Sequence, residues 1–476
     1  MKFEKYNAKT LGELKRSGYK YIPIREEIRN NVIQKLKNKE QLFPGIHGYE
    51  ESVEPQIIHS LLSGHHTVFL GEKGQAKSRI MRSITSFLDE YIPVIDGTDV
   101  YEDPLSCFTI QAKKMVESMK DDLPIRWLHR SERYGERLSA GLKISDLIGD
   151  IDPSKIIAGS PLNSEGALHF GIIPRTNRGI FAINELPDLD YLVQVALFNI
   201  MEEGDIQIRG FPFQFPLDVL ILFSANPGDY SRSGKIIPQL KDRMGSEIRT
   251  HYPLDRKTSL VITRQEAFLP ESEIPLVFPS FMEDINEELT RQARNSRFIN
   301  QRSGVSARFS VANFETLAAS ALRRALLLNE KKAVVRPTDL GNIFSSALGK
   351  IELDPYRDEA VTEYHVLSGL IEQAFSACFS EKFDSTHIET KIDEIVKDIE
   401  SCRSVEASDM MPSSEYRLIL KNVPGLFDLI SSLIDIHDDH EVASAVEFVL
   451  ESLVALKKIS RKKSGKLNQF RSVDRY

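Results

Sequence analysis

The sequence contains little cysteine and no long apolar run. Its three cysteines, Cys107, Cys378 and Cys402, are scattered along 476 residues without disulfide or metal-ligand spacing. No stretch approaches the roughly 20 apolar residues that a membrane-spanning helix needs. The opening MKFEKYNAKTLGELKRSGYKY lacks the apolar core of a secretory signal. We therefore expect neither a disulfide-stapled secreted domain nor a membrane span, and the reducing cytoplasm is the expected setting.

An excess of basic charge is absent too. The 61 Lys and Arg residues against 69 Asp and Glu residues give a net charge of −8, which argues against broad nucleic-acid binding. The one basic cluster lies near the C-terminus, at Lys457, Lys458, Arg461, Lys462, Lys463 and Lys466. We expect this tail to be a solvated, frayed end rather than an anionic docking site.

The pattern of apolar runs predicts several domains, because 476 residues are too many for one compact core. Four short runs alternate with helical stretches, as in an α/β domain with a parallel sheet: HTVFLGE at 66–72, IRWLHR at 125–130, GIFAINE at 179–185 and DVLILFSAN at 218–226. Beyond about residue 254 the periodicity is helical. We expect a helix-and-loop extension at 1–41, an α/β core at 42–256, a helical lid at 257–352 and a C-terminal helical region with the basic tail at 353–476.

The strongest motif is GEKGQAKSRIMRSI at 71–84, which follows an apolar strand and opens a helix. Backbone amides and the helix N-terminus in such a loop bind phosphates. Lys77 would reach the β- and γ-phosphates, and the Ser78 hydroxyl would ligate magnesium. Ala76 departs from the usual glycine, and the plain alternative is a simple strand-to-helix turn. The candidate binding residues are Gly71, Glu72, Lys73, Gly74, Gln75, Ala76, Lys77, Ser78 and Arg79.

The end of the 179–185 run carries an amide followed by an acid. P-loop ATPases place an acidic pair at such a strand end, the first residue for magnesium and the second as general base. Here Glu185 stands at the base position and Asn184 at the magnesium position. Because Asn184 is neutral, we expect weaker magnesium binding or slower turnover. The alternative is that the pair caps the next helix, together with Asp188 and Asp190.

Three further polar residues follow in order. Asn226 ends an apolar run and is expected to orient an attacking water beside Glu185. Arg243 follows Asp242 in a polar turn, where it would neutralise charge on a neighbouring subunit's γ-phosphate or simply form a surface salt bridge. Arg308 precedes a strongly amphipathic helix and either contacts nucleotide from the lid or marks a helix start.

The order of these motifs resembles that of AAA+ ATPases, and their details resemble the magnesium-chelatase ATPase subunit and its MoxR relatives over about residues 42–350. FPGIHGYEESVEPQIIHSLLSGHHTVFLGEKGQAKS is similar to the opening of the chelatase subunit, which makes His47, Gly48 and Tyr49 candidates to flank adenine. The stretch 142–178 resembles the β-hairpin insert of that family. PQLKDRMG places the arginine finger at Arg243, SGVSARFS places the second sensor at Arg308, and Asn226 matches the first sensor.

The resemblance implies a P-loop, parallel-sheet core followed by a helical lid, and an ATP hydrolase that requires ATP and Mg²⁺. It also implies a homo-oligomeric, hexameric or similar ring with active sites between subunits, and a partner that carries a von Willebrand A-type metal-binding domain. A MoxR-like chaperone that remodels a partner protein is the favoured function. Three alternatives stay open: a nucleotide-gated switch with little hydrolysis, a catalytically dead scaffold, and a transcription activator or helicase, although no Gly-Ala-Phe-Thr-Gly-Ala loop is present.

Overall fold

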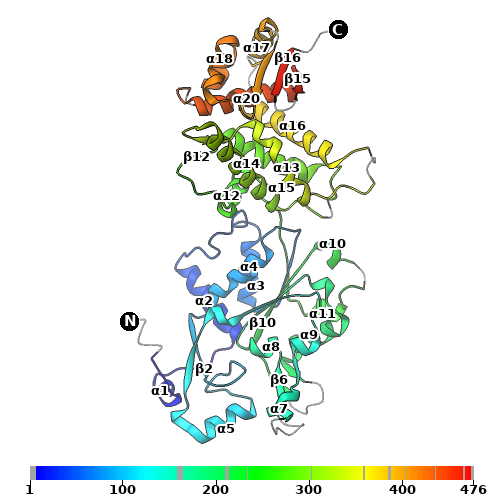
Figure 1. Ribbon diagram of the computed structural model, residues 1–476. Helices are drawn as coiled ribbons and strands as arrows, with labels where there is room; N and C mark the ends of the chain where they lie inside the picture. The colour runs from blue at the N-terminus through cyan, green and yellow to red at the C-terminus, as the bar shows by residue number, and fades with distance from the viewer. Residues whose placement is uncertain are drawn as a thin grey trace. The chain divides into compact units, whose positions relative to one another are not determined.

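The computed structural model divides the chain into two compact units, Met1–His251 and Tyr252–Tyr476. Figure 1 labels the helices and strands of each unit. The structure describes residues 7–157, 165–208, 214–232, 234–301, 303–356, 360–383, 388–402, 404–434, 436–464 and 467–472.

The first unit is built on a five-stranded sheet with the strand order β11–β1–β10–β7–β4. All four neighbouring pairs are parallel, which confirms the predicted P-loop α/β core. The strands are β1 (Thr67–Leu70), β4 (Tyr134–Leu138), β7 (Gly179–Asn184), β10 (Val219–Ala225) and β11 (Ser246–Arg249). The three inner strands are apolar and buried, whereas the edge strands β4 and β11 are polar.

Side chains of the inner strands alternate between two hydrophobic cores, because successive residues of a strand point to opposite faces. One core collects Ile180 and Ala182 of β7 together with Leu220 and Leu222 of β10. It is covered by α2 (Ile24–Lys37), α3 (Glu54–Ser63) and α4 (Lys77–Ser83). The other core takes the intervening residues and is covered by α8 (Ile172–Arg175), α9 (Tyr191–Glu203) and α11 (Pro238–Arg243). Figure 1 shows these two sets of helices on opposite sides of the sheet.

The run at 125–130 does form a strand, β3 (Ile125–His129), but this strand is not in the parallel sheet. It pairs antiparallel with β2 (Tyr91–Ile95) in a separate two-stranded sheet. Ile95 of β2 packs in one cluster with residues of α1 (Leu11–Arg16) and α5 (Ile110–Met119). The expectation that this run belongs to the parallel sheet was therefore wrong, and the polar strand β4 pairs with β7 in that sheet.

An antiparallel strand pair lies within 142–178, where the β-hairpin insert is expected. It consists of β5 (Gly149–Ile151) and β6 (Leu168–Phe170), and part of the predicted insert, 158–164, lies outside the described residues. The remaining elements of the unit are α6 (Ile144–Leu147), α7 (Pro153–Ile157), β8 (Asp205–Gln207), β9 (Gln214–Pro216) and α10 (Pro227–Tyr230).

The second unit is mainly helical and has one continuous core that runs from Phe281 to Phe470. Its centre is α20 (Asp439–Ala455), in which every residue from Val442 to Leu453 is buried. The other helices are α12 (Arg256–Glu266), α13 (Ser280–Asn295), α14 (Ala307–Leu328), α15 (Phe344–Ala347), α16 (Glu363–Lys382), α17 (Ile388–Cys402), α18 (Tyr416–Asn422) and α19 (Leu426–Ser431). A short parallel pair joins β12 (Leu276–Val277) to β13 (Ala333–Val334).

The described part of the basic tail is folded into strands, contrary to the expectation of a frayed end, while Lys466 lies outside the described residues. Strands β15 (Ile459–Ser464) and β16 (Leu467–Ser472) pair antiparallel, and β14 (Val405–Ser408) completes a three-stranded sheet. Ile459 and Phe470 anchor this sheet in the core of the unit, while Arg461 pairs with Glu451 of α20. Apolar anchors between the basic residues therefore outweigh the repulsion within the segment.

The three cysteines are free thiols. Among the helices in the described residues, none combines the length and the apolar character that crossing a membrane requires.

Candidate functional site

The 71–76 loop connects β1 to α4 and takes a strained path to do so. The Gly71 amide donates to the carbonyl of Ala225 on the neighbouring strand β10, at 3.1 Å. Gly74 and Ala76 both have positive φ, of 79° and 57°. Only Ala76 carries a Cβ in this left-handed conformation, and such strain is characteristic of functional loops. The loop therefore bends back over the end of β1 before α4 begins at Lys77.

A buried set of polar side chains holds the loop in place. The Gln75 Oε1 atom accepts from the Glu72 amide at 3.0 Å and from the Thr250 hydroxyl at 2.8 Å. The Tyr49 hydroxyl lies 3.0 Å from the Gln75 carbonyl and 2.8 Å from the His251 carbonyl. Because Gln75 is only 6% exposed, these bonds replace water as its partners and fix the loop.

Gly71 has no space for a side chain in this arrangement. A Cβ there would lie 1.8 Å from Thr250 Oγ1 and 2.3 Å from Gln75 Oε1. Position 71 therefore requires glycine, because the side chains of Thr250 and Gln75 occupy the space that a Cβ would fill.

Lys77 opens α4 and folds back over the loop. Its Nζ donates to the carbonyl of Glu72 at 2.8 Å and also to that of Gly71. Burial lowers the pKa of Lys77 to about 8, although the nearby carboxylates of Glu72 and Glu185 oppose the shift. The ammonium group is thus held in a partly dry site, where anionic phosphate would be its strongest partner.

Ser78, the next residue, reaches across to the sheet. Its hydroxyl donates to Asn184 Oδ1 at 3.0 Å, and the Ser224 hydroxyl donates to the same atom at 2.9 Å. Asn184 and Ser224 lie close to Ser78 because alternate residues of a strand point to the same face, and both residues belong to the set that faces α4. Side chains from α4, β7 and β10 therefore meet at the Oδ1 atom of Asn184.

The amide nitrogen of Asn184 has a carboxylate partner. Nδ2 donates to Glu136 Oε1 on β4 at 2.7 Å, and Arg82 of α4 donates to Glu136 Oε2 at 2.7 Å. Burial opposes ionisation of Glu136, but the bonds from Arg82 and Asn184 outweigh it and lower its pKa. Glu136 is therefore a carboxylate next to the position predicted for magnesium.

Glu185 follows Asn184 in an unusual backbone conformation, with φ 60° and ψ 49°. The Ser139 hydroxyl lies 2.7 Å from the Glu185 carbonyl and 2.5 Å from the Asn184 carbonyl, and the Ser139 amide also donates to the latter. The Glu185 side chain is exposed. This left-handed turn ends β7 and leaves the carboxylate free to reach water.

Oxygen donors of the kind that magnesium prefers are gathered here: the Ser78 and Ser224 hydroxyls, the Asn184 amide and the Glu136 carboxylate. In the described part of the chain, no group of three or more His, Cys, Asp or Glu side chains is arranged to hold a metal ion. The donor set therefore fits a magnesium ion that takes further ligands from phosphate and water.

The structure brings Lys77, Ser78, Asn184 and Glu185 together but does not bring every predicted residue to them. Asn226 precedes α10 at the end of β10, and its side chain makes no hydrogen bond to described residues. Arg243 ends α11 and pairs with Glu202 of α9, Nη2 to Oε1 at 2.9 Å. Arg308 is exposed in the first turn of α14, in the second unit.

Around the loop, His47 and Gly48 are half-buried, and Gly48 has a φ of 81°. Tyr49 is buried, and its ring meets His251 edge-on at 5.0 Å between centroids. Lys73 of the loop and Arg79 of α4 are exposed.

Four residues of the site were missed in the sequence: Ser224 as a partner of Asn184, Glu136, Ser139 and Thr250. Ser224 was detectable, because strand parity places it on the same face as Asn184. The other three lie on or beside the polar edge strands β4 and β11, which gave no apolar signal.

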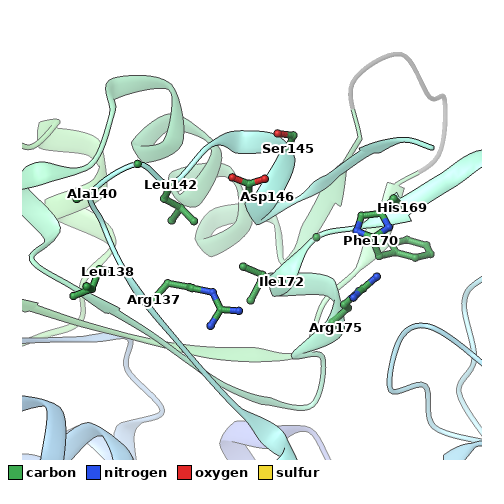
Figure 2. A pocket seen from close by; sticks show the side chains of 12 residues that line it. Arg137, Leu138, Ala140, Leu142, Ser145, Asp146, His169, Phe170, Ile172 and Arg175 are labelled. Carbon is green, nitrogen blue, oxygen red and sulfur yellow. The ribbon is translucent and has the colours of Figure 1, made fainter. Parts of the chain in front are cut away.

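A separate cavity of about 460 Å³ lies on the other side of β4. Figure 2 shows Arg137 and Arg175 extending toward it, with His169 and Phe170 of β6 nearby. Arg137 follows Glu136 in the strand and points to the opposite face. This cavity therefore belongs to the β5–β6 region rather than to the phosphate loop.

No protein-family model matches the chain. Among solved structures, the chain is similar to the complex between subunits BchI and BchD of magnesium chelatase, with 19% identity over 66% of this chain and 97% of that chain and a TM-score of 0.35. It is also similar to NtrX from Brucella abortus, with 12% identity, coverage of 73% and 66%, and a TM-score of 0.37. For NtrX in complex with ADP the identity is 11%, the coverage 87% and 72%, and the TM-score 0.37.

These TM-scores are below 0.5, so the assignment of the fold rests on the chain's own strand order and loop. A parallel sheet, a phosphate-type loop between β1 and α4, a polar strand end at Asn184 and a following helical unit are the parts that the AAA+ resemblance implies. The chain therefore has a parallel-sheet α/β core with a phosphate-type loop, the fold that the resemblance to AAA+ ATPases implies.

Proposed function

We propose that this chain is a Mg-ATP-dependent ATPase. The observation that supports this function most strongly is the meeting of Lys77, Ser78 and Asn184 at the carboxyl ends of three parallel strands, with Glu185 next in the chain. Ligands bind at this edge of open parallel sheets. The second support is the positive φ of Ala76, in the loop after β1, and of Glu185, directly after β7. Such strained backbone is characteristic of functional sites.

Each residue has a role that follows from its chemistry. The loop amides and the N-terminus of α4 hold the phosphates, and the Lys77 ammonium moves from the loop carbonyls to the β- and γ-oxygens. Ser78, with the Asn184 amide behind it, would hold magnesium, which neutralises phosphate charge when bound. The exposed Glu185 carboxylate accepts a proton from the attacking water, and Asn226 orients that water.

The arginines point to an oligomer. Arg243 and its partner Glu202 are both partly exposed, at 41% and 34% of their side chains. A pair of this kind opens at little cost, so Arg243 is available to a γ-phosphate bound by a second copy. We propose a homo-oligomeric ring, with Arg243 as its trans-acting arginine and Arg308 as a nucleotide contact from the helical unit.

The magnesium-chelatase resemblance suggests the class of partner. A protein with a von Willebrand A-type metal-binding domain is the proposed partner, and its remodelling is the proposed use of ATP. Movement of the β5–β6 hairpin during the ATP cycle would transmit the conformational change to the partner protein.

A second function has its own support in Asn184. A neutral residue at the magnesium position would slow hydrolysis, and the chain would then act as a switch whose ATP-bound form selects partners. This alternative predicts tight binding of ATP with negligible turnover, even when the partner is present.

Equilibrium binding separates both functions from a scaffold that binds no nucleotide. Titration with a fluorescent ATP analogue and Mg²⁺ is expected to show saturable binding that is lost in Lys77→Ala. Lys257→Ala, on α12 of the second unit, serves as the matched control and should bind normally. Equal binding by wild type and Lys77→Ala would rule out the proposed site.

A further inference from the structure

Glu136 is a carboxylate that the motif pattern does not contain, yet it contacts Asn184, the residue that departs from the acidic pair of that pattern. Asn184 supplies no charge at the position where related ATPases carry an acid. Glu136 contacts the Asn184 amide nitrogen at 2.7 Å from the neighbouring strand β4. We propose that Glu136 is a positioning residue for magnesium, which orients the Asn184 amide and supplies the negative charge that Asn184 lacks. This inference rests on the proposed ATPase function.

The contact between Glu136 and Asn184 follows from the register of the sheet. Glu136 lies opposite Ala182 and Leu138 opposite Asn184 in the parallel β4–β7 pair. Glu136 therefore shares a face with Ala182 and Asn184, the face covered by α4, whereas Arg137 faces the other core. A carboxylate at position 135 or 137 would point away from the site.

The contact also fixes which way the Asn184 amide points. With Nδ2 on the Glu136 carboxylate, Oδ1 faces the hydroxyls of Ser78 and Ser224. The opposite orientation would set Oδ1 against a carboxylate, which repels it. Asn184 thus presents an acceptor to Ser78, as an aspartate would, and its dipole is polarised by the negative charge behind it.

Arg82 pairs with Glu136 but does not cancel the negative charge of its carboxylate. The Arg82 side chain is 65% exposed, while that of Glu136 is 21% exposed. Solvent screens the arginine more strongly than it screens the carboxylate. If the carboxylate served only as a partner for Arg82, its removal would leave magnesium binding unchanged.

The test is the coupling between magnesium and nucleotide in the full chain. The Kd of a fluorescent ATP analogue is measured in EDTA and in saturating Mg²⁺, and the ratio of the two values reports the magnesium contribution. Loss of a residue that supports a metal ligand typically weakens metal binding by about 10- to 100-fold. We expect Glu136→Gln to reduce the ratio by at least about tenfold, with the Kd in EDTA unchanged or lower, since a negative charge near the phosphates is gone.

Two further variants separate the proposed role from a structural one. Glu132→Gln removes a carboxylate four residues away, which forms an ion pair with Arg126 at 3.1 Å and accepts from the His129 amide at 3.3 Å, and it should leave the ratio at the wild-type value. The double variant Asn184→Asp/Glu136→Gln exchanges the amide and the carboxylate while keeping a bond between them. It is expected to restore the ratio to within about threefold of wild type, as coupled positions do in a double-mutant cycle.

The outcomes are distinct. A wild-type ratio in Glu136→Gln, or equal weakening of binding in EDTA and in Mg²⁺, would overturn the role of Glu136 and leave the ATPase function standing. Failure of the double variant to recover, with an unchanged melting temperature, would also overturn it. Wild-type protein that binds no nucleotide in either buffer would refute the ATPase function and this inference together.

Discussion

Replacing Ala76 with glycine should stabilise the first unit. Ala76 has φ 57° and ψ 15°, a left-handed conformation that costs a residue with a Cβ about 1–2 kcal/mol. Glycine removes that cost but loses about 0.4–1 kcal/mol through the greater freedom of the unfolded chain. At the midpoints of these two ranges, the net gain in the free energy of unfolding is about 0.8 kcal/mol, which corresponds to a rise of roughly 2–3 °C in Tm for a unit of this size.

The single tryptophan of the sequence offers a direct readout. Trp127 lies on β3, in the same unit as the loop, and its indole nitrogen donates to the carbonyl of Ala8. Thermal unfolding followed by tryptophan fluorescence therefore reports the first unit without contribution from the second.

Ala196→Gly is the matched control, because Ala196 lies inside α9 of the same unit. Glycine in a helix interior costs about 1 kcal/mol, so this variant should melt earlier than wild type. If Ala76→Gly lowered Tm as Ala196→Gly does, Ala76 would not hold a left-handed conformation in solution, and the loop described above would be wrong.

Three other changes test the site. Gly71→Ala places a Cβ 1.8 Å from a buried threonine hydroxyl and should cost about 1–3 kcal/mol of stability, whereas Gly228→Ala, with no atom within 4 Å of its Cβ, should be tolerated in the same melting assay. With the pKa of Lys77 lowered to about 8 by burial, about three quarters of this amine is neutral at pH 8.5. ATP binding should therefore take up most of a proton at pH 8.5 and little at pH 7, in calorimetry with buffers of different ionisation heat, and a pH-independent proton count would contradict the assignment. Ser139→Ala removes the hydroxyl that holds the turn at Glu185 and should slow turnover by about tenfold with unchanged ATP affinity; weakened binding in an equilibrium titration would instead indicate a general loss of structure.

The class of fold could be predicted because its signals are local. An apolar strand followed by a glycine-containing loop and a helix is readable over about 20 residues, and β1, the loop and α4 occupy the expected stretch. The inner strands β7 and β10 are likewise apolar up to their polar ends at Asn184 and Ser224, since both of their faces are buried. Their predicted positions were correct for the same reason.

The edge strands could not be predicted in this way. The sequences of β4 and β11, YGERL and SEIR, are polar because one edge of each strand meets solvent. The more apolar run at β3 was assigned to the parallel sheet instead, although it pairs antiparallel with β2 in a separate sheet. Glu136 and Thr250, which lie on and beside these edge strands, were missed as a consequence.

The C-terminal sheet was missed for a different reason. Strands β15 and β16 contain several basic residues, so charge dominated the prediction of a frayed end. Their partner β14 lies more than 50 residues earlier in the chain, and a pairing over such a distance leaves no local pattern. The anchors Ile459 and Phe470 were visible only once the core was known.

The most direct test of the ATPase function is steady-state ATP hydrolysis by the purified chain with Mg²⁺, beside Lys77→Ala and Glu185→Gln. The proposed function predicts turnover by wild type that rises per subunit with protein concentration, no binding by Lys77→Ala, and binding without turnover by Glu185→Gln. Turnover in Glu185→Gln equal to that of wild type would contradict the assignment of the general base. A wild type that binds ATP yet never hydrolyses it would contradict the ATPase and leave the nucleotide-gated switch.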